Sequence, residues 1–315
     1  MKAQTAYLCG PRKVELREVD VPDPGPGEVQ VRTVANGICM LEVSYYTGAE
    51  KAAEPFAAGH EGIGLVTKLG RGVQNVREGD YVHCFRWATV QNVGAGALLK
   101  FDPPPPDPAV CLAEPAVCAC IALRTYGLTA GDRALLLGAG FMGLLNVQAL
   151  AHSALAELVV ADLKPHNLDL AREFGATETI QIGTAAGDAR LEQLRSNPFD
   201  LVVEAAGAEQ ALQAAAGLTR AGGRLCIFSW HHKPRTVNFG EWHVKGLTVV
   251  NSSPSIAHDH NTNYFHRAIR LLGNGTFDMS KLVTHRHPLS QVKEAMELAA
   301  QRPPGYIKGV LTFEE

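Results

Sequence analysis

The chain has few cysteines, and they are scattered. Its 315 residues include seven cysteines, an odd number at irregular positions, which excludes a disulfide framework and predicts a reduced, cytoplasmic location. Charged residues are also sparse, at 19%, and a net charge of −3 leaves no broad basic surface. Because nucleic acids and anionic membranes bind to such surfaces, neither is an expected partner.

Long apolar runs are missing as well. No stretch approaches the roughly 20 uninterrupted apolar residues that a membrane span requires. The N-terminal segment MKAQTAYLCGPRKVELREV carries charges throughout and lacks the apolar core of a signal peptide. The length, together with 46% hydrophobic residues, instead predicts an ordinary globular protein of two domains without membrane association.

The first third of the chain has the pattern of β-strands. VELREV, VQVRTVA and GIGLVTKLG are rich in β-branched residues and are separated by glycine and proline, as in PDPGPGE. The run FDPPPPDP, ending at Pro108, can continue neither a helix nor a central strand. It is interpreted as an extended connector.

Beyond this connector the periodicity changes. RALLLGAG, LVVADL, FDLVVEAAG and GRLCIFSW are short apolar runs, and helical patterns such as FMGLLNVQALAHSA and LDLAREFGA separate them. Strands that alternate with helices predict an α/β domain with a doubly wound parallel sheet. From about residue 256 we expect a helix (TNYFHRAIRLLGNG), a short extended piece (LVTHRHPL) and a second helix (QVKEAMELAAQ).

A glycine motif follows the first strand of this α/β region. Gly138, Gly140 and Gly143 form G-x-G-x-x-G between a predicted strand and a predicted helix. In that context the first glycine allows a tight turn, the second admits a pyrophosphate and the third lets the helix pack on the sheet. The helix N-terminus would face the phosphates.

Asp162 stands nineteen residues after Gly143, at the end of LVVAD. A carboxylate there would accept hydrogen bonds from the ribose hydroxyls of NAD and repel the 2′-phosphate of NADP. Lys164 lies close enough to weaken this preference, and Asp162 could also be a turn residue after a buried strand. The motif therefore predicts a dinucleotide site that favours NAD over NADP.

Three short segments before this region hold metal-ligating side chains: Cys39 in GIC, His60 and Glu61 in AAGHEGIG, and Glu114 in LAEPA. A catalytic zinc takes three ligands from Cys, His and carboxylates and keeps a fourth position open. Taken singly, each has an ordinary alternative: a buried thiol, a structural histidine, or a glutamate that caps a helix.

These segments, in their amino-acid sequences and their order, resemble the zinc-dependent medium-chain dehydrogenase/reductase family, in its polyol (sorbitol-like) and threonine dehydrogenase branch. The resemblance covers nearly the whole chain: VPDPGPGEVQVRTVANGIC, GHEGIGLVTKLGRGVQNVREGDYV, LAEPAVCACIAL, LLLGAGFMGLL, FDLVVEAAG, AGGRLCIF and YIKGVL follow in the family's order. It implies a GroES-like β-rich domain at residues 1–121 and 256–315 and a Rossmann domain at residues 122–255.

The same resemblance implies the site residues. Cys39, His60 and Glu114 match ligands of one catalytic zinc per chain, and Glu61 matches a glutamate that supports or replaces a ligand. The cofactor contacts expected from the motif and the resemblance are Gly138, Gly140, Phe141, Met142, Gly143, Asp162, Leu163, Lys164 and Ala206.

One departure concerns the second metal site of the family. A structural zinc held by four cysteines would follow GDYV, but the segment HCFRWATVQNVGAGALLKFDPPPP contains only Cys84. Because a closed zinc site needs four ligands, no structural zinc is expected. Cys84 and Cys111 are predicted to be buried or inert.

The other departure concerns proton transfer. Relatives read C-G-(S/T)-D where this chain has Cys39-Met40-Leu41-Glu42, so leucine stands in place of the hydroxyl that relays the alcohol proton. A leucine can neither donate nor accept a proton. Four residues remain as candidates for proton transfer or for lining the substrate pocket, and the sequence does not choose among them or a water chain: Glu42, Ser44, Tyr45 and Glu61.

The segment SWHHKPRTVNFGEWHVKG, residues 229–246, gathers tryptophans, histidines and an arginine. It is either a surface loop or a contact for a polyhydroxylated or anionic substrate.

The sequence as a whole predicts an NAD-dependent, zinc-dependent dehydrogenase of a secondary alcohol such as a polyol, sugar or cyclitol. The alternatives are a zinc-free quinone or enone reductase and a non-catalytic NAD-binding protein. A homodimer or homotetramer paired through the strand near GLTVVNSS is expected from the resemblance.

Overall fold

The structure is a computed structural model that describes residues 1–253 and 264–313. The chain forms two compact units, one made of Met1–Ala116 and Phe265–Glu315 and the other of Val117–Tyr264. The sequence places the domain boundaries at 121/122 and 255/256, and the second of these lies outside the described residues. The α/β fold class is confirmed, with a β-rich unit and a parallel-sheet unit.

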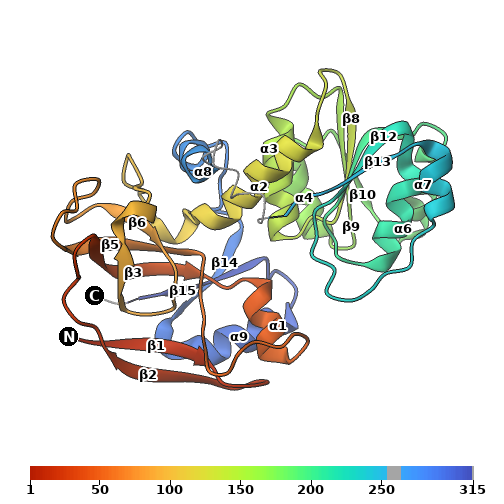
Figure 1. Ribbon diagram of the computed structural model, residues 1–315. Helices are drawn as coiled ribbons and strands as arrows, with labels where there is room; N and C mark the ends of the chain where they lie inside the picture. The colour runs from red at the N-terminus through yellow and green to blue at the C-terminus, as the bar shows by residue number, and fades with distance from the viewer. Residues whose placement is uncertain (254–263, 314–315) are drawn as a thin grey trace. The chain divides into compact units, whose positions relative to one another are not determined.

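The first unit is built on two sheets (Figure 1). A three-stranded sheet has the order β2-β1-β4, and a larger one has the order β14-β15-β3-β5-β6, with β7 also paired to β3. In the larger sheet β3 and β5 are antiparallel, whereas β14 and β15, far along the chain, are parallel. The strands are β1 (Lys2–Leu8), β2 (Val14–Asp20), β3 (Glu28–Gly37), β4 (Phe56–Ala57), β5 (Gly62–Leu69), β6 (Tyr81–Cys84), β7 (Val90–Gly94), β14 (Val283–Pro288) and β15 (Lys308–Thr312).

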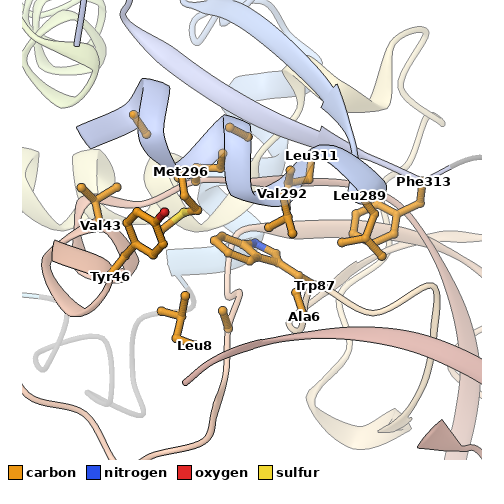
Figure 2. Packing of buried hydrophobic residues seen from close by; sticks show 14 of the residues in the cluster. Ala6, Leu8, Val43, Tyr46, Trp87, Leu289, Val292, Met296, Leu311 and Phe313 are labelled. Carbon is orange, nitrogen blue, oxygen red and sulfur yellow. The ribbon is translucent and has the colours of Figure 1, made fainter. Parts of the chain in front are cut away.

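Helices α1 (Met40–Thr47) and α9 (Val292–Gln301) pack in the core of this unit. Figure 2 shows Trp87, which is fully buried, among side chains from both helices and from β15. The Trp87 indole N–H donates to the Gly37 carbonyl at 3.3 Å, so the ring is satisfied although water cannot reach it. This core fixes the end of β3, where the candidate metal ligands begin.

The second unit is a six-stranded parallel sheet in the order β10-β9-β8-β11-β12-β13. Its central strands are almost completely buried, because helices cover a doubly wound sheet on both faces. The strands are β8 (Arg133–Leu137), β9 (Glu157–Asp162), β10 (Glu178–Gln181), β11 (Phe199–Glu204), β12 (Thr219–Ile227) and β13 (Thr248–Asn251).

The helices of this unit follow the strands in alternation. Lys245, at the end of α7, donates to the carbonyls of Ala216, Gly217 and Thr219 and so fastens α7 to the end of α6. The helices are α3 (Phe141–Ala151), α4 (Pro165–Glu173), α5 (Ala185–Leu194), α6 (Glu209–Leu218) and α7 (Phe239–Lys245); α2 (Ala113–Tyr126) precedes β8, and α8 (Tyr264–Gly273) precedes β14. Short 3₁₀ turns occur at η1 (Ala95–Ala97), η2 (Pro108–Val110) and η4 (Leu289–Gln291).

Among residues 1–253 and 264–313, one helical segment, Pro108–Tyr126, is long and apolar enough to cross a membrane by length and composition. The prediction from the sequence did not identify this segment, because it required an uninterrupted run of apolar residues. Its most apolar window is 61% buried within the protein, as in the core helix of a globular fold, so the segment is weak evidence for a membrane span.

The elements expected in the last part of the chain are present where the structure describes them. The helix predicted at TNYFHRAIRLLGNG is α8, although its first two residues lie outside the described part. LVTHRHPL contains β14, and QVKEAMELAAQ contains α9.

Candidate metal centre and dinucleotide site

The candidate metal ligands come from three turns of the first unit. Cys39 follows β3 as the N-cap residue of α1, and Glu42 lies in the first turn of that helix. His60 and Glu61 lie directly before β5, and Glu114 lies in the first turn of α2. Each of these residues lies at or next to the end of a helix or a strand, so the adjacent secondary structure fixes the position of its side chain.

The structure brings these side chains into two groups that share His60. In one group the ligand atoms of Cys39, Glu42 and His60 all lie within 4.8 Å of one another. In the other, those of His60, Glu61 and Glu114 do the same. The ligand set implied by the resemblance, Cys39, His60 and Glu114, is therefore divided between two groups with His60 in both.

Glu42 orients the His60 ring. The carboxylate, 1% exposed, has its Oε1 at 2.7 Å from His60 Nδ1 and accepts a hydrogen bond from the Gly59 amide at 3.2 Å. A histidine that donates Nδ1–H to a carboxylate leaves Nε2 for a metal ion. The sequence proposed Glu42 for proton transfer; its position shows a role in holding the histidine that sequence reasoning did not find.

The charges around His60 alter its protonation. Burial alone lowers the pKa of His60, but hydrogen bonds to Cys39 and Glu42 and the charges of Glu42 and Glu61 outweigh it and raise the pKa to about 12. Burial, followed by the charge of Glu61, raises the pKa of the Cys39 thiol. Bringing acidic groups, a thiol and an imidazole together in a buried place creates a site suited to a cation.

The residues present fit a zinc ion. They offer sulfur, imidazole nitrogen and carboxylate oxygen, the donor set of catalytic zinc sites. Glu42 Oε2 is buried and, among the residues that the structure describes, has no hydrogen-bond partner. Because a buried carboxylate oxygen normally has a partner, this oxygen is an independent sign that the group is built for a cation.

Glu61 is paired with a lysine from the far end of the sequence. Its Oε2 lies 2.5 Å from Nζ of Lys308, and the two side chains are 3% and 6% exposed. Burial lowers the pKa of Lys308, but the charges of Glu61 and Cys39, together with a hydrogen bond to Glu61 and the charge of Tyr306, outweigh burial and raise the pKa overall. Sequence analysis did not single out Lys308; a lone lysine within the apolar strand IKGVLTF was the signal that could have identified it.

Gly37, the last residue of β3, leaves room for this pair. A Cβ atom at Gly37 would lie 1.9 Å from Glu61 Oε2 and 2.9 Å from Leu112 Cδ1. Gly37→Ala is therefore expected to push the Glu61 carboxylate away from Lys308 and lower the free energy of unfolding by about 1–3 kcal/mol. Urea denaturation measures the change.

The control for this substitution is Gly94→Ala in β7 of the same unit, where an added Cβ meets no atom within 4 Å. We expect its stability to change by less than about 1 kcal/mol. Equal losses in the two variants would contradict the close packing of Gly37 against Glu61.

Ser44 and Tyr45, both candidates from the sequence, make their contacts within the helix and the core. The Ser44 hydroxyl donates to the Leu41 carbonyl at 2.7 Å, one turn back in α1. The Tyr45 ring packs edge-on against Phe56, with centroids 5.4 Å apart. Neither contact tests a part in proton transfer or in substrate binding, so that part stays a prediction for both residues.

Cys84 and Cys111, the two cysteines predicted to be buried or inert, lie in environments that favour the protonated thiol. Cys84 is fully buried and burial raises its pKa to about 12, while burial raises that of Cys111 to about 11. Among the described residues, neither thiol belongs to a group of potential metal ligands, in contrast to Cys39. All seven cysteines are free thiols.

The glycine motif has the geometry of a dinucleotide loop. Gly138 has φ of +100°, a conformation that favours glycine, and it directly follows β8. Gly140 is the N-cap residue of α3, and Phe141, Met142 and Gly143 form the first turn of that helix, the end at which a helix attracts an anion. An added Cβ would meet nothing within 4 Å at Gly140, whereas at Gly143 it would lie 2.0 Å from the Gly138 carbonyl oxygen.

Asp162 ends β9 beside this loop. Its Oδ2 accepts from the Ala139 amide at 2.6 Å and its Oδ1 from the Lys164 amide at 2.8 Å. The carboxylate is thus fixed, yet each oxygen keeps a lone pair for a ribose hydroxyl. Leu163, 65% exposed, stands next to it, and the backbone of Ala206 lies against Gly138.

The loop after β12 contains a buried contact that the sequence did not reveal. His231 Nε2 lies 2.9 Å from Glu204 Oε2 at the end of β11, and Arg235 donates Nε–H to His231 Nδ1 at 3.0 Å. Trp230, 58% exposed, stacks on His232 with ring centroids 4.3 Å apart. Part of residues 229–246 is thus anchored inside the unit, and part lies at its surface.

Two family models match this chain. A model of the alcohol dehydrogenase GroES-like domain covers residues 25–98, and a model of the zinc-binding dehydrogenase domain covers residues 142–272. The chain belongs to the medium-chain, zinc-dependent alcohol dehydrogenase family, as its sequence predicted.

The chain is similar in sequence to sorbitol dehydrogenases and in fold to solved dehydrogenase structures. Sorbitol dehydrogenase from Gallus gallus is 29% identical over 334 residues, which cover 94% of this chain and 92% of that protein. The fold matches that of L-idonate 5-dehydrogenase from Escherichia coli with a TM-score of 0.84 at 22% identity and 99% coverage of both chains. A structure from Sinorhizobium meliloti 1021 that was solved with NADP bound matches with a TM-score of 0.86, also at 22% identity and 99% coverage of both chains.

Proposed function

We propose that this protein oxidises a secondary alcohol of polyol, sugar or cyclitol type, or reduces the corresponding ketone, with NAD as hydride carrier and one zinc ion per chain. The observation that carries the proposal is the convergence of Cys39, Glu42, His60, Glu61 and Glu114 in one unit. Sorbitol and L-idonate, named for two of the proteins compared, are both polyhydroxylated.

Zinc bound at this site would act as a Lewis acid that polarises the alcohol or carbonyl oxygen. Cys39, His60 and a carboxylate would hold the ion, and Glu42 would keep the His60 ring oriented. Lys308 neutralises Glu61, so that this buried carboxylate is stable next to the ligands. The proton route remains among Glu42, Glu61, Ser44 and water, because Leu41 cannot relay a proton.

NAD is the proposed dinucleotide because of Asp162. Its carboxylate lies at the end of β9 and is fixed by the amides of Ala139 and Lys164, where it would repel a 2′-phosphate. Since a protein of the same fold was solved with NADP bound, the preference for NAD rests on the residue at this position and not on the fold.

A substrate screen combined with metal analysis tests the proposal. Purified protein should contain about one zinc per chain and reduce NAD with at least one polyol, sugar or cyclitol, with little reduction of NADP. Less than about half an equivalent of zinc together with quinone or enone reduction would support a zinc-free reductase instead. NAD binding without turnover of any of these alcohols would support a non-catalytic protein.

A homodimer or homotetramer in a reducing, cytoplasmic compartment is the proposed state. None of the seven cysteines forms a disulfide bond, which suits such a compartment. β13 ends the parallel sheet, and within residues 1–253 and 264–313 it has a neighbouring strand on one side only. An edge strand of this kind can pair with its copy in a second chain.

Light scattering at micromolar concentration should give twice or four times the monomer mass. Val250→Lys, which adds a charge to β13, should shift the mass toward 33.8 kDa because a lysine opposes edge pairing. Leu163→Lys, at an exposed position after β9, is the control and should keep the assembly. A monomeric wild-type protein would contradict the proposal.

A further inference from the structure

Glu204 occupies the point of the second unit where a ligand crevice is expected. The chain runs from β8 outward through β9 and β10 and then returns to β11 on the other side of β8. In open α/β sheets, ligands bind outside the carboxyl ends of the two strands at such a reversal. Glu204 ends β11 directly opposite Leu137 of β8, and its side chain is completely buried.

One carboxylate oxygen of Glu204 begins a chain of hydrogen bonds into the loop after β12. Glu204 Oε2 accepts from the Ser229 hydroxyl and from His231 Nε2 at 2.9 Å, and His231 Nδ1 accepts from Arg235 Nε at 3.0 Å. Arginine can only donate, so Nδ1 must be the acceptor and Nε2 must carry the proton. The chain therefore fixes His231 as a single neutral tautomer between a carboxylate and a guanidinium.

The other oxygen holds the loop that faces the glycine motif. Glu204 Oε1 accepts from the amides of Ala206 at 2.9 Å and Gly207 at 2.7 Å, and the Gly207 carbonyl accepts from Arg235 Nη2 at 3.2 Å. The hydrogen bonds form a closed ring through Glu204, His231, Arg235 and Gly207. Residues 206 and 207 are thereby held from both sides.

This loop contacts the first glycine of the dinucleotide motif. A Cβ atom at Gly138 would lie 2.7 Å from the backbone N and Cα of Ala206, so the two backbones are in close contact. A shift of Ala206 would therefore be passed to the turn at Gly138, the turn that must accept the pyrophosphate.

We propose that Glu204, His231 and Arg235 are positioning residues for the dinucleotide: through residues 206 and 207 they set the shape of the Gly138 turn. The inference rests on the proposed function in that a dinucleotide binds this unit. It goes beyond that function because it makes the affinity for the dinucleotide depend on a ring of hydrogen bonds whose residues need not contact the cofactor.

Glu204→Gln tests the ring because an amide cannot replace this carboxylate. Whichever way the amide is turned, its NH2 group faces at least one N–H donor, either His231 Nε2–H or the amides of Ala206 and Gly207. The Ser229 hydroxyl can rotate and accept from the NH2 group, but it does not remove the conflict with His231. His231 cannot switch tautomer to relieve the conflict, since Arg235 donates to its other nitrogen. Arg235→Met removes that obstacle and allows His231 to accept a hydrogen bond from the new amide.

The dissociation constant of NADH, measured by fluorescence titration without substrate, is the readout. Glu204→Gln should raise it at least about 10-fold in the wild-type background but less than about 3-fold in the Arg235→Met background, a coupling of the size seen between residues in contact. Equal increases in both backgrounds, or no increase in either, would overturn the proposal. Lys245→Met, which removes three carbonyl contacts elsewhere in the unit, is the control and should lower the melting temperature without changing NADH affinity.

A second pair of variants applies if Glu204→Gln does not fold. His231→Gln keeps one donor and one acceptor, and we expect NADH affinity within about 3-fold of wild type, whereas His231→Leu should weaken it at least about 10-fold. Equal effects of the two would overturn the proposal. Failure to turn over any alcohol, with NADH binding intact, would overturn the proposed function and leave this inference standing.

Discussion

His60→Ala is expected to remove zinc from the purified protein and to reduce alcohol oxidation by at least about 10³-fold, because a Lewis acid contributes several kcal/mol and each ~1.4 kcal/mol changes the rate tenfold. His60 belongs to both metal-ligating groups, so neither group remains complete without it. Metal analysis by plasma emission and initial rates with NAD measure the two effects.

Two cysteine variants serve as a matched comparison for this prediction. Cys39→Ser should lower zinc content because the residue belongs to a metal-ligating group, whereas Cys84→Ser should keep it, since Cys84 is a fully buried thiol beside Thr33. Full zinc content and activity in His60→Ala would contradict the assignment of the site. So would equal zinc loss in both cysteine variants.

Gly140→Ala and Gly143→Ala are expected to weaken dinucleotide binding for different reasons. At Gly143 the new Cβ would meet the Gly138 carbonyl at 2.0 Å, so the loop must move. We expect the free energy of unfolding to fall by about 1–3 kcal/mol. The dissociation constant of NADH should rise at least about 100-fold, which corresponds to about 2.8 kcal/mol.

At Gly140 the new Cβ would enter open space, so the fold should keep its stability within about 0.5 kcal/mol. The dinucleotide phosphates must approach that same space, and affinity should still fall at least about 10-fold. Thermal melting without cofactor and NADH titration separate the two cases. A Gly140→Ala protein that binds NADH as tightly as wild type would show that the pyrophosphate does not approach this glycine.

The parts of the fold that depend on local sequence could be predicted. The glycine motif, the strand before it and Asp162 at the end of the next strand lie close together in the chain, between Arg133 and Asp162, and their spacing alone sets the geometry. The alternation of strands and helices likewise predicted the parallel sheet. In patterns of this kind, the spacing of residues within a short segment is enough to predict the local structure.

The contacts of the candidate site could not be predicted in the same way. Glu61 and Lys308 are separated by most of the chain, and they meet because β15 pairs with β3 beside β5. The sequence listed Ser44 among several candidates for proton transfer, and it could not show that the hydroxyl donates to the Leu41 carbonyl within α1. In SWHHKPR the side chains of Ser229 and His231 both reach Glu204, whereas Trp230 and His232 stack on each other, an arrangement that only the fold specifies.

The position of β15 also has a consequence for the order of events during synthesis. Cys39, His60 and Glu114 are synthesised before most of the parallel-sheet unit, whereas Lys308 and β15, the strand that joins β14 to β3, follow that unit in the chain. The parallel-sheet unit, which is continuous in the chain, can fold while translation still proceeds. The β-rich unit therefore cannot complete its larger sheet, and Glu61 cannot gain its buried counter-ion Lys308, until the chain beyond the parallel-sheet unit has been made.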